Sequence, residues 1–141
     1  MDRKSKILLV EDDIGLASVY KARLEAEGFQ VEHCSDGEAA LSTAIKFRPD
    51  LIILDVMMPK ISGFDVLDIL HNTPETMNIK VVLLTALSQP KDIEKAKQLG
   101  ADDYMVKSQV VIADVIERIK HHLSMDGSAP KAAAAGPQVP K

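Results

Sequence analysis

The sequence predicts an α/β fold, a doubly wound five-stranded parallel sheet with helices on both faces. Apolar runs and amphipathic stretches alternate five times between residues 6 and 123, and the connections between them are short. The run Leu51–Leu54 is apolar at every position and lies between Pro49 and Pro59, as expected for a central strand that is covered on both faces. We expect the flavodoxin-like (βα)5 strand order 2-1-3-4-5, in which strands one and three flank the switch point.

Five segments have the composition of strands. They lie near residues 6–10, 30–33, 51–54, 79–84 and 103–106, and most are rich in Val, Ile and Leu. No uninterrupted apolar run exceeds four residues, which is too short to span a bilayer. These segments therefore predict a buried sheet and no membrane partner.

An amphipathic helix is predicted after each strand. Gly28 ends the first helix, Pro74 follows the third, and Ser88 with Pro90 opens the fourth, which Gly100 closes. The apolar faces are, in order, Leu16, Val19, Tyr20 and Leu24; Ala40, Leu41, Ala44 and Phe47; Phe64, Leu67 and Leu70; Ile93, Ala96 and Leu99; and Ile112, Val115, Ile116, Ile119 and Leu123.

Bulk composition narrows the domain plan and the partners. The chain has 141 residues, and its net charge of −4 gives no electrostatic footprint for direct nucleic-acid binding. Ten of the eighteen residues in 124–141 are Ala, Gly or Pro, so we expect one domain at 1–123 and a disordered tail at 124–141. No output domain is expected after residue 123, and the lone Cys34, without a disulfide or zinc partner, favours a reducing cytoplasm.

Candidate site residues follow four of the predicted strands where each strand ends. Glu11 and Asp12 follow strand one, Asp55 and Met57 follow strand three, and Thr85 and Lys107 follow strands four and five. In an open parallel sheet these ends share one edge, so the side chains are expected to converge there. Crowded carboxylates repel one another unless a cation or a proton neutralises them. The pattern therefore predicts a site for a divalent cation.

The same residues form an inventory for phosphoryl transfer. Asp55 can attack phosphorus, as carboxylates do in aspartyl-phosphate chemistry. Glu11, Asp12, Asp55 and the carbonyl of Met57 offer the hard oxygen ligands that Mg²⁺ prefers. Lys107 can neutralise one phosphoryl oxygen, and Thr85 can donate a hydrogen bond to another.

Four motifs together resemble the receiver domain of response regulators in two-component signalling, over about residues 5–123. They are Val10–Asp13, Leu54–Pro59 with Gly63, Leu84–Ala86, and Gly100–Lys107. The resemblance implies a switch that accepts phosphate on Asp55 from the phosphohistidine of a sensor histidine kinase or a phosphotransfer protein, and that binds a downstream protein. It implies Mg²⁺ on Glu11, Asp12, Asp55 and Met57, with Asp12 as a direct ligand. It assigns phosphoryl binding and switching to Thr85, Ala86, Tyr104 and Lys107.

Phosphorylation is expected to move Thr85 toward the phosphoryl group and to open space into which Tyr104 turns. The surface that changes carries mixed charges and resembles the dimerisation face of receivers in the winged-helix transcription-factor subfamily. A two-fold interface is self-complementary, so acids of one subunit could meet bases of the other in a homodimer, while a heterologous partner on the same surface and a merely solvated face stay equally open. The residues of this expected dimer face are Lys97, Asp102, Asp103, Asp114 and Arg118.

One position departs from the family pattern. Ser108 follows Lys107 where the family usually has proline after a cis peptide bond. A cis bond without proline costs about 3–4 kcal/mol, so the cis or trans state of this bond is left open.

Other functions are weighed against the switch. A phosphorelay intermediate and a pseudo-receiver scaffold remain alternatives. A phosphatase of the haloacid-dehalogenase type would need an Asp two residues after its nucleophile, where this chain has Met57, so we expect no enzyme acting on external substrates. A flavin binder is rejected because acids occupy the place of a phosphate-binding loop.

Several polar residues have simpler explanations. Asp13 precedes the first amphipathic stretch and is expected to be a helix N-cap rather than a metal ligand. His121 and His122 are expected to be solvated or to complement a helix dipole. No role is assigned to His33 or His71, and Cys34 is expected to be a small buried side chain.

Overall fold

The computed structural model describes residues 4–124, which contain five strands and five α-helices. The strands are β1 (Lys6–Val10), β2 (Gln30–Cys34), β3 (Leu51–Leu54), β4 (Lys80–Thr85) and β5 (Asp103–Val106). The helices are α1 (Ile14–Ala26), α2 (Gly37–Phe47), α3 (Gly63–His71), α4 (Pro90–Gln98) and α5 (Ile112–Ser124), with a short 3-10 helix η1 (Lys107–Gln109) after β5. Apart from Ser124, which ends α5, the predicted tail lies outside the described residues.

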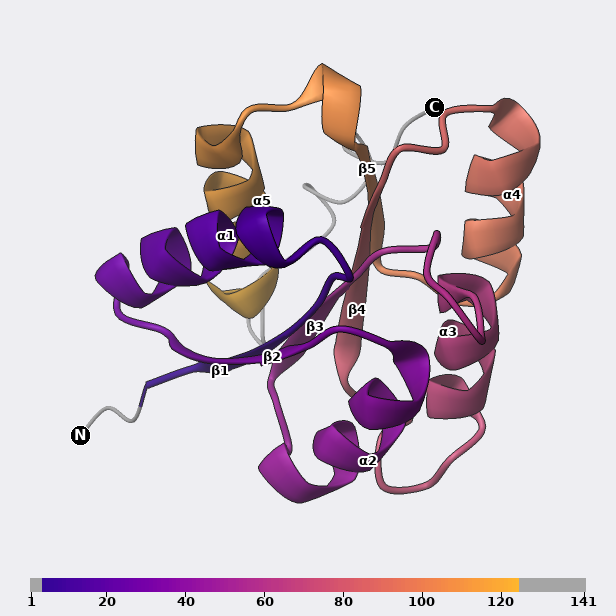
Figure 1. Ribbon diagram of the computed structural model, residues 1–141. Coiled ribbons are helices and arrows are strands. Elements are labelled where there is room, and N and C mark those ends of the chain that lie inside the picture. Colours follow the sequence, from indigo (N-terminus) through magenta and orange to yellow (C-terminus); the bar gives the residue numbers. More distant parts are fainter. Residues whose placement is uncertain (1–3, 125–141) are drawn as a thin grey trace.

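The strands form one parallel sheet in the order β2-β1-β3-β4-β5 (Figure 1), which confirms the predicted topology. In the register, Val10 of β1 lies opposite Cys34 of β2 and Leu54 of β3. The carboxyl ends of β1 and β3 therefore meet at the centre of one sheet edge, and this register brings the segments after them together.

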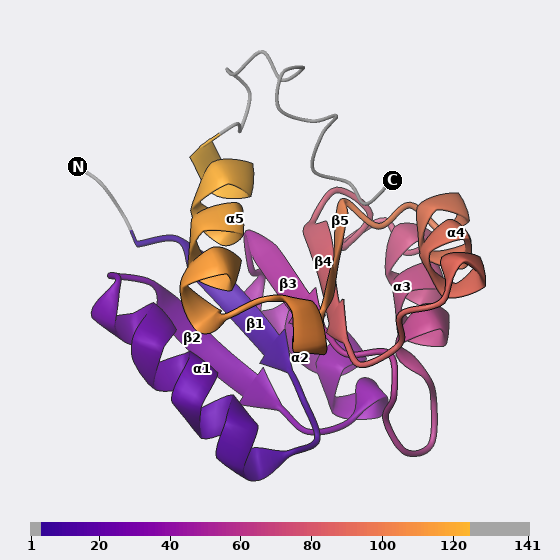
Figure 2. The same ribbon diagram turned by 90° about the horizontal axis from the view of Figure 1, so that it is seen from above.

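Helices cover both faces of the sheet. Figure 2, seen from above, shows α1 and α5 on one side and α3 and α4 on the other. Alternate β1 residues serve the two layers: Leu8 and Val10 pack in the core under α2, α3 and α4, while Ile7 and Leu9 pack in the core under α1 and α5. All four residues of β3 are at most 1% exposed. Because β3 is buried on both faces, it needs the continuous apolar run that identified it.

Two details of the helices differ from the sequence prediction. Helix α1 buries Ala17, Tyr20 and Leu24, whereas Val19 is 56% exposed, because a residue next to the buried stripe is turned about 100° away from it. Helix α4 begins at Pro90 with Gln89 as N-cap and no side-chain cap, so Ser88 lies one residue too early to cap it. Pro90 accounts for that start, since its fixed φ and missing N–H suit the first helical position.

None of the helices in residues 4–124 is long and apolar enough to cross a membrane.

Candidate functional site

The turn from β1 to α1 carries three consecutive acids with different surroundings. Asp13 is the N-cap of α1, and its Oδ1 accepts a hydrogen bond from the Leu16 N–H at 3.0 Å, as predicted. Glu11 is 4% exposed, and its Oε2 accepts from the Asp13 N–H at 3.1 Å. Asp12 between them is exposed. The carboxylate of Asp13 therefore caps α1, whereas those of Glu11 and Asp12 are not used as helix caps and are candidates for the site.

Asp55 begins the loop after β3 and is also only 4% exposed. Its backbone N–H donates to the Val10 carbonyl at 3.1 Å, which fastens the loop to the end of β1. Its Oδ1 accepts from the Met57 N–H at 3.1 Å. The carboxylate is therefore fixed from its own loop and held beside the β1–α1 turn.

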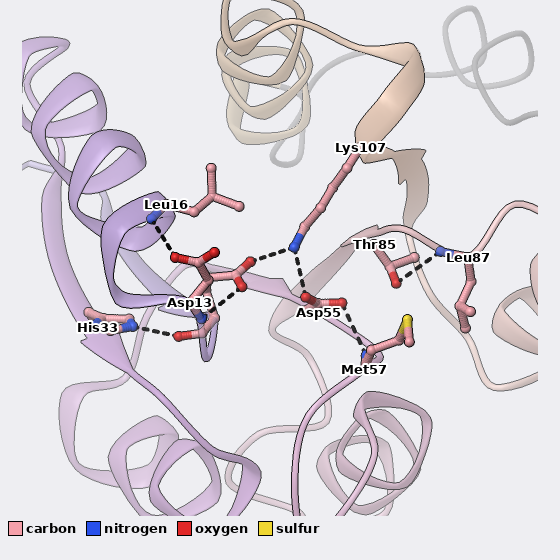
Figure 3. Close-up of polar contacts among 9 residues, drawn as sticks. Asp13, Leu16, His33, Asp55, Met57, Thr85, Leu87 and Lys107 are labelled. Atoms are coloured by element: carbon pink, nitrogen blue, oxygen red, sulfur yellow. Dashed lines mark hydrogen bonds and ion pairs between the residues drawn. The ribbon is translucent and has the colours of Figure 1, made fainter.

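Lys107 contacts the carboxylates of both Glu11 and Asp55, and it comes from the end of the edge strand β5. Its Nζ lies 2.8 Å from Glu11 Oε1 and 2.8 Å from Asp55 Oδ2, and Figure 3 shows the Lys107 side chain pointing to Asp55. The lysine is the first residue of η1, directly after β5. No peptide bond within residues 4–124 is cis, so the Lys107–Ser108 bond is trans.

Burial and pairing shift the pKa values of these groups. Burial raises the pKa of Glu11, although the hydrogen bond from Lys107 opposes that rise. Burial alone would lower the pKa of Lys107, but the hydrogen bonds to Asp55 and Glu11 outweigh it and raise that pKa. Lys107 is therefore a charged ammonium that serves as the internal counter-ion of two buried acids.

The structure brings three carboxylates into one cluster. Oxygens of Glu11, Asp12 and Asp55 all lie within 4.8 Å of one another. Hard carboxylate oxygens at this spacing suit Mg²⁺ or Ca²⁺ better than a softer metal. One ammonium balances three acids, so the residues present fit an added divalent cation.

Thr85 is the last residue of β4, Ala86 follows it, and Tyr104 lies on the neighbouring β5. Thr85 is fully buried at the end of β4, and its Oγ1 accepts from the Leu87 N–H at 3.4 Å, whereas Ala86 is exposed. Tyr104 is 3% exposed and its hydroxyl donates to the Leu87 carbonyl at 2.8 Å. Burial, followed by the charges of Asp92 and Asp55, raises the pKa of Tyr104 to about 12.

Tyr104 thus already lies inside the protein. An inward rotation of this ring, expected to follow phosphorylation, has no outward starting position in this structure. The hydrogen bonds of Thr85 and Tyr104 both end on Leu87, so the loop after β4 is the element that couples them here.

The expected dimer face is only partly a surface. Lys97, Asp102 and Asp114 are exposed, but Asp103 is 3% exposed and is bonded within the chain. Its oxygens accept from Arg118 Nε at 2.9 Å and Nη2 at 2.5 Å, and His122 Nε2 lies 2.9 Å from Oδ2. Burial opposes ionisation of Asp103, but the hydrogen bonds from His122 and Arg118 outweigh it and lower its pKa.

This internal cluster corrects two expectations. Asp103 is a buried partner of Arg118 rather than an exposed charge, because inward-facing residues of β5 meet α5 across the core. His122 is not merely solvated, since its ring contacts the same carboxylate. Sequence alone offered no signal for this cluster, which depends on how α5 lies against β5.

Two other histidines also have partners that the sequence did not indicate. His71 Nδ1 lies 2.7 Å from the Leu99 carbonyl, and His33 Nε2 lies 2.8 Å from the Glu11 carbonyl. The second contact belongs to the site, and Figure 3 shows His33 beside the acidic turn. The register that places His33 opposite Leu9 creates it, and no local pattern encodes that register.

Gly63 should be essential to the position of Asp55. Its N–H donates to the Val56 carbonyl at 2.8 Å, and a Cβ on it would meet the Asp55 carbonyl oxygen and lie 2.7 Å from Val56 Cα. Gly63→Ala is therefore expected to lower the free energy of unfolding by about 1–3 kcal/mol, measured by urea denaturation.

Gly15→Ala is the matched control. A Cβ there would meet Asp13 Oδ1 at an ordinary 3.5 Å, and alanine in a helix is favoured over glycine by about 0.5–1 kcal/mol. Equal effects of the two substitutions would show that the loop after β3 tolerates a side chain at Gly63.

Comparison with known proteins finds a family model and individual proteins that are similar to this chain. A model of the response regulator receiver domain matches residues 7–120. The DNA-binding dual master transcriptional regulator RpaA of Synechocystis is 34% identical over 91% of this chain and 53% of its own length. The transcriptional regulatory protein CpxR of Escherichia coli K12 is 47% identical over 73% of this chain and 43% of its own.

A solved structure agrees with these matches. The CheY-like response regulator receiver domain protein from Methanospirillum hungatei JF-1 superposes with a TM-score of 0.81 at 26% identity, covering 86% of this chain and 95% of that one. The present chain spans about half the length of the regulators named above.

Proposed function

This chain belongs to the response regulator receiver domain family, and from that premise we propose that it is a signalling switch phosphorylated on Asp55. The observation that carries the proposal is the setting of Asp55. This carboxylate is buried at a strand end, 2.8 Å from Lys107 Nζ and within 4.8 Å of the carboxylates of Glu11 and Asp12. Among the described residues, it is the carboxylate placed between an acidic pair and a half-buried ammonium.

The proposed reaction moves a phosphoryl group from a phosphohistidine of a sensor kinase or phosphotransfer protein. An oxygen of Asp55 attacks phosphorus, a P–O bond forms, and the P–N bond breaks with its electron pair remaining on the imidazole nitrogen. The product is an acyl phosphate on Asp55. Met57 supports this step, because its N–H holds Oδ1 at 3.1 Å and so limits rotation of the nucleophile.

Charge repulsion opposes the approach of an anionic phosphoryl group to three acids. We assign Mg²⁺ binding to Glu11, Asp12 and Asp55, with the Met57 carbonyl as a further oxygen ligand. When bound, Mg²⁺ supplies the positive charge that offsets this repulsion. Lys107 is already within hydrogen-bonding distance of Asp55 Oδ2, so it can transfer part of its hydrogen bonding to an incoming phosphoryl oxygen.

Thr85 is proposed to sense the phosphoryl group. Its hydroxyl is buried beside the site and accepts from Leu87 only at a long 3.4 Å, so a strong new acceptor can draw it away. The Leu87 carbonyl also accepts a hydrogen bond from the Tyr104 hydroxyl. A shift of Thr85 would therefore reach the surface of α4, β5 and α5 through this loop, which includes the exposed Ala86.

No turnover of external substrates is proposed. Met57 stands where an aspartyl phosphatase would place a general acid, and this residue is 53% exposed. A phosphorelay intermediate remains an alternative because it uses the same chemistry on Asp55. We place the protein in the cytoplasm on the lone Cys34, and we propose no direct nucleic-acid contact for the acidic domain described here.

The output surface is proposed to lie on α4, β5 and α5. A homodimer and a different partner protein both suit its exposed charges, Lys97, Asp102 and Asp114. A dimer that used Asp103 and Arg118 across the two-fold axis would first have to break their internal pair. Sedimentation with and without beryllofluoride distinguishes the two: a monomer in both states excludes the dimer and favours the other partner.

The function is tested by incubating the protein with acetyl phosphate and MgCl₂ and measuring its intact mass. We expect the increment of a single phosphoryl group, its loss in alkali as for an acyl phosphate, and no increment in EDTA. A folded protein that gains no phosphoryl group from either acetyl phosphate or a phosphorylated kinase would contradict the proposal.

A further inference from the structure

The position of Asp12 is set by backbone rather than by its own side-chain contacts. Within residues 4–124, the Asp12 carboxylate makes no hydrogen bond or ion pair. By contrast, Glu11 is tied to Lys107, and Asp55 to Lys107 and Met57. The distance of Asp12 from the other two acids therefore depends on how firmly the β1–α1 turn is held.

Two backbone groups of Glu11 anchor that turn to β2. The Glu11 N–H donates to the Cys34 carbonyl at 3.0 Å, which extends the β1–β2 pairing by one step. The Glu11 carbonyl, which belongs to the peptide group leading into Asp12, has no such backbone donor among the described residues, because β2 ends at Cys34. A carbonyl left without a donor would be free to tilt, and the following peptide would tilt with it.

His33 supplies the missing donor. Its Nε2 lies 2.8 Å from the Glu11 carbonyl oxygen, and since a carbonyl only accepts, Nε2 carries the proton. The ring is half-buried on β2, a strand paired in register with β1 through Leu9. Figure 3 shows the imidazole reaching the turn from the side opposite Lys107. A rigid strand thus clamps the peptide that leads into Asp12.

We propose that His33 is a positioning residue for Mg²⁺ binding, acting through the Glu11 carbonyl to hold Asp12 within reach of Asp55. This inference rests on the proposed function, because it assumes that the acidic cluster binds Mg²⁺. His33 contacts neither the ion nor the phosphoryl group. It acts as hydrogen-bonding partners beyond the ligands commonly do, by fixing the orientation of the groups that bind the metal.

The test replaces His33 by two amide side chains of different length, of which only the longer can reach the Glu11 carbonyl. The amide nitrogen of Gln extends about as far from the backbone as His Nε2, whereas that of Asn stops one bond short. His33→Asn and His33→Leu are expected to raise the Kd for Mg²⁺ by roughly 10-fold, and His33→Gln is expected to stay close to wild type. The Kd is measured by titrating MgCl₂ into each protein and following backbone-amide NMR shifts.

A second readout separates positioning from a general loss of structure. The Mg²⁺ concentration that gives half-maximal phosphorylation by acetyl phosphate should rise in His33→Asn, while the rate at saturating Mg²⁺ stays near wild type. His71→Leu is the matched control, because it removes another half-buried histidine from a backbone carbonyl, that of Leu99. It should leave the Mg²⁺ titration unchanged even if urea denaturation in EDTA shows a similar loss of stability.

The outcomes are distinguishable. A wild-type protein that binds Mg²⁺ while His33→Asn and His33→Leu keep its Kd overturns the role of His33 alone. A Kd for His33→Gln as weak as that for His33→Asn also overturns it, as does an equal shift in His71→Leu. A wild type that binds no Mg²⁺ overturns the proposed function and this inference together.

Discussion

Asp55→Asn is expected to abolish phosphorylation by acetyl phosphate and by any cognate kinase. An amide oxygen is a far weaker nucleophile than a carboxylate, and the substitution also removes one of the three acids that form the cation cluster. Intact-mass measurement should therefore find no phosphoryl increment in this variant after the time that saturates wild type.

Asp65→Asn is the matched control for this substitution. It makes the same change of charge on an exposed residue in the first turn of α3, outside the acidic cluster. This variant should gain one phosphoryl group as wild type does. An alkali-labile phosphoryl group on Asp55→Asn would mean that another carboxylate is the acceptor, and the proposed site would then be wrong.

Asp12→Ala is expected to change phosphorylation and stability in opposite directions. Loss of a Mg²⁺ ligand should slow phosphorylation by at least about 100-fold, because charge stabilisation by a metal ion amounts to several kcal/mol. In EDTA, however, the same change leaves two acids rather than three in the carboxylate cluster. Relief of that repulsion should raise the free energy of unfolding by up to about 1 kcal/mol.

The adjacent residue provides the control. Asp13 caps α1 through its hydrogen bond with the Leu16 N–H, so Asp13→Ala should lower the free energy of unfolding by about 1 kcal/mol. It should leave the Mg²⁺ titration near wild type. Urea denaturation in EDTA and MgCl₂ titration of both variants check the pair. A destabilised Asp12→Ala protein would mean that Asp12 is a structural acid rather than a metal ligand.

Lys107 pairs with two of the three acids of the site in this structure. Its ammonium already bonds both Glu11 and Asp55 at 2.8 Å, so buried acids are partly neutralised before any cation or phosphoryl group arrives. This arrangement places a positive charge beside each of the two buried carboxylates and so offsets part of the cost of their burial. Under the proposed function, an incoming phosphoryl oxygen would gain hydrogen bonds from Lys107 only by exchange with a carboxylate, which would favour the phosphorylated form less than an unpaired lysine would.

The sequence by itself determined the architecture and the set of residues around Asp55. Strands that are buried on both faces need continuous apolar runs, so Leu51–Leu54 identified β3 directly. Parallel strands align their carboxyl ends, so residues after β1, β3 and β5 had to share one edge. The sequence signals for where a helix begins were less exact. Ser88 was expected to open α4 together with Pro90, but the helix begins at Pro90.

Only the tertiary structure decided which side chains contact one another. The burial of Asp103 against Arg118 and His122, the inward position of Tyr104, and the hydrogen bond from His33 to the Glu11 carbonyl each join segments that are distant in sequence. Each contact requires a particular strand register or helix orientation. Strand register and helix orientation are set by packing over the whole core, to which many side chains contribute together. A local sequence pattern therefore does not predict them.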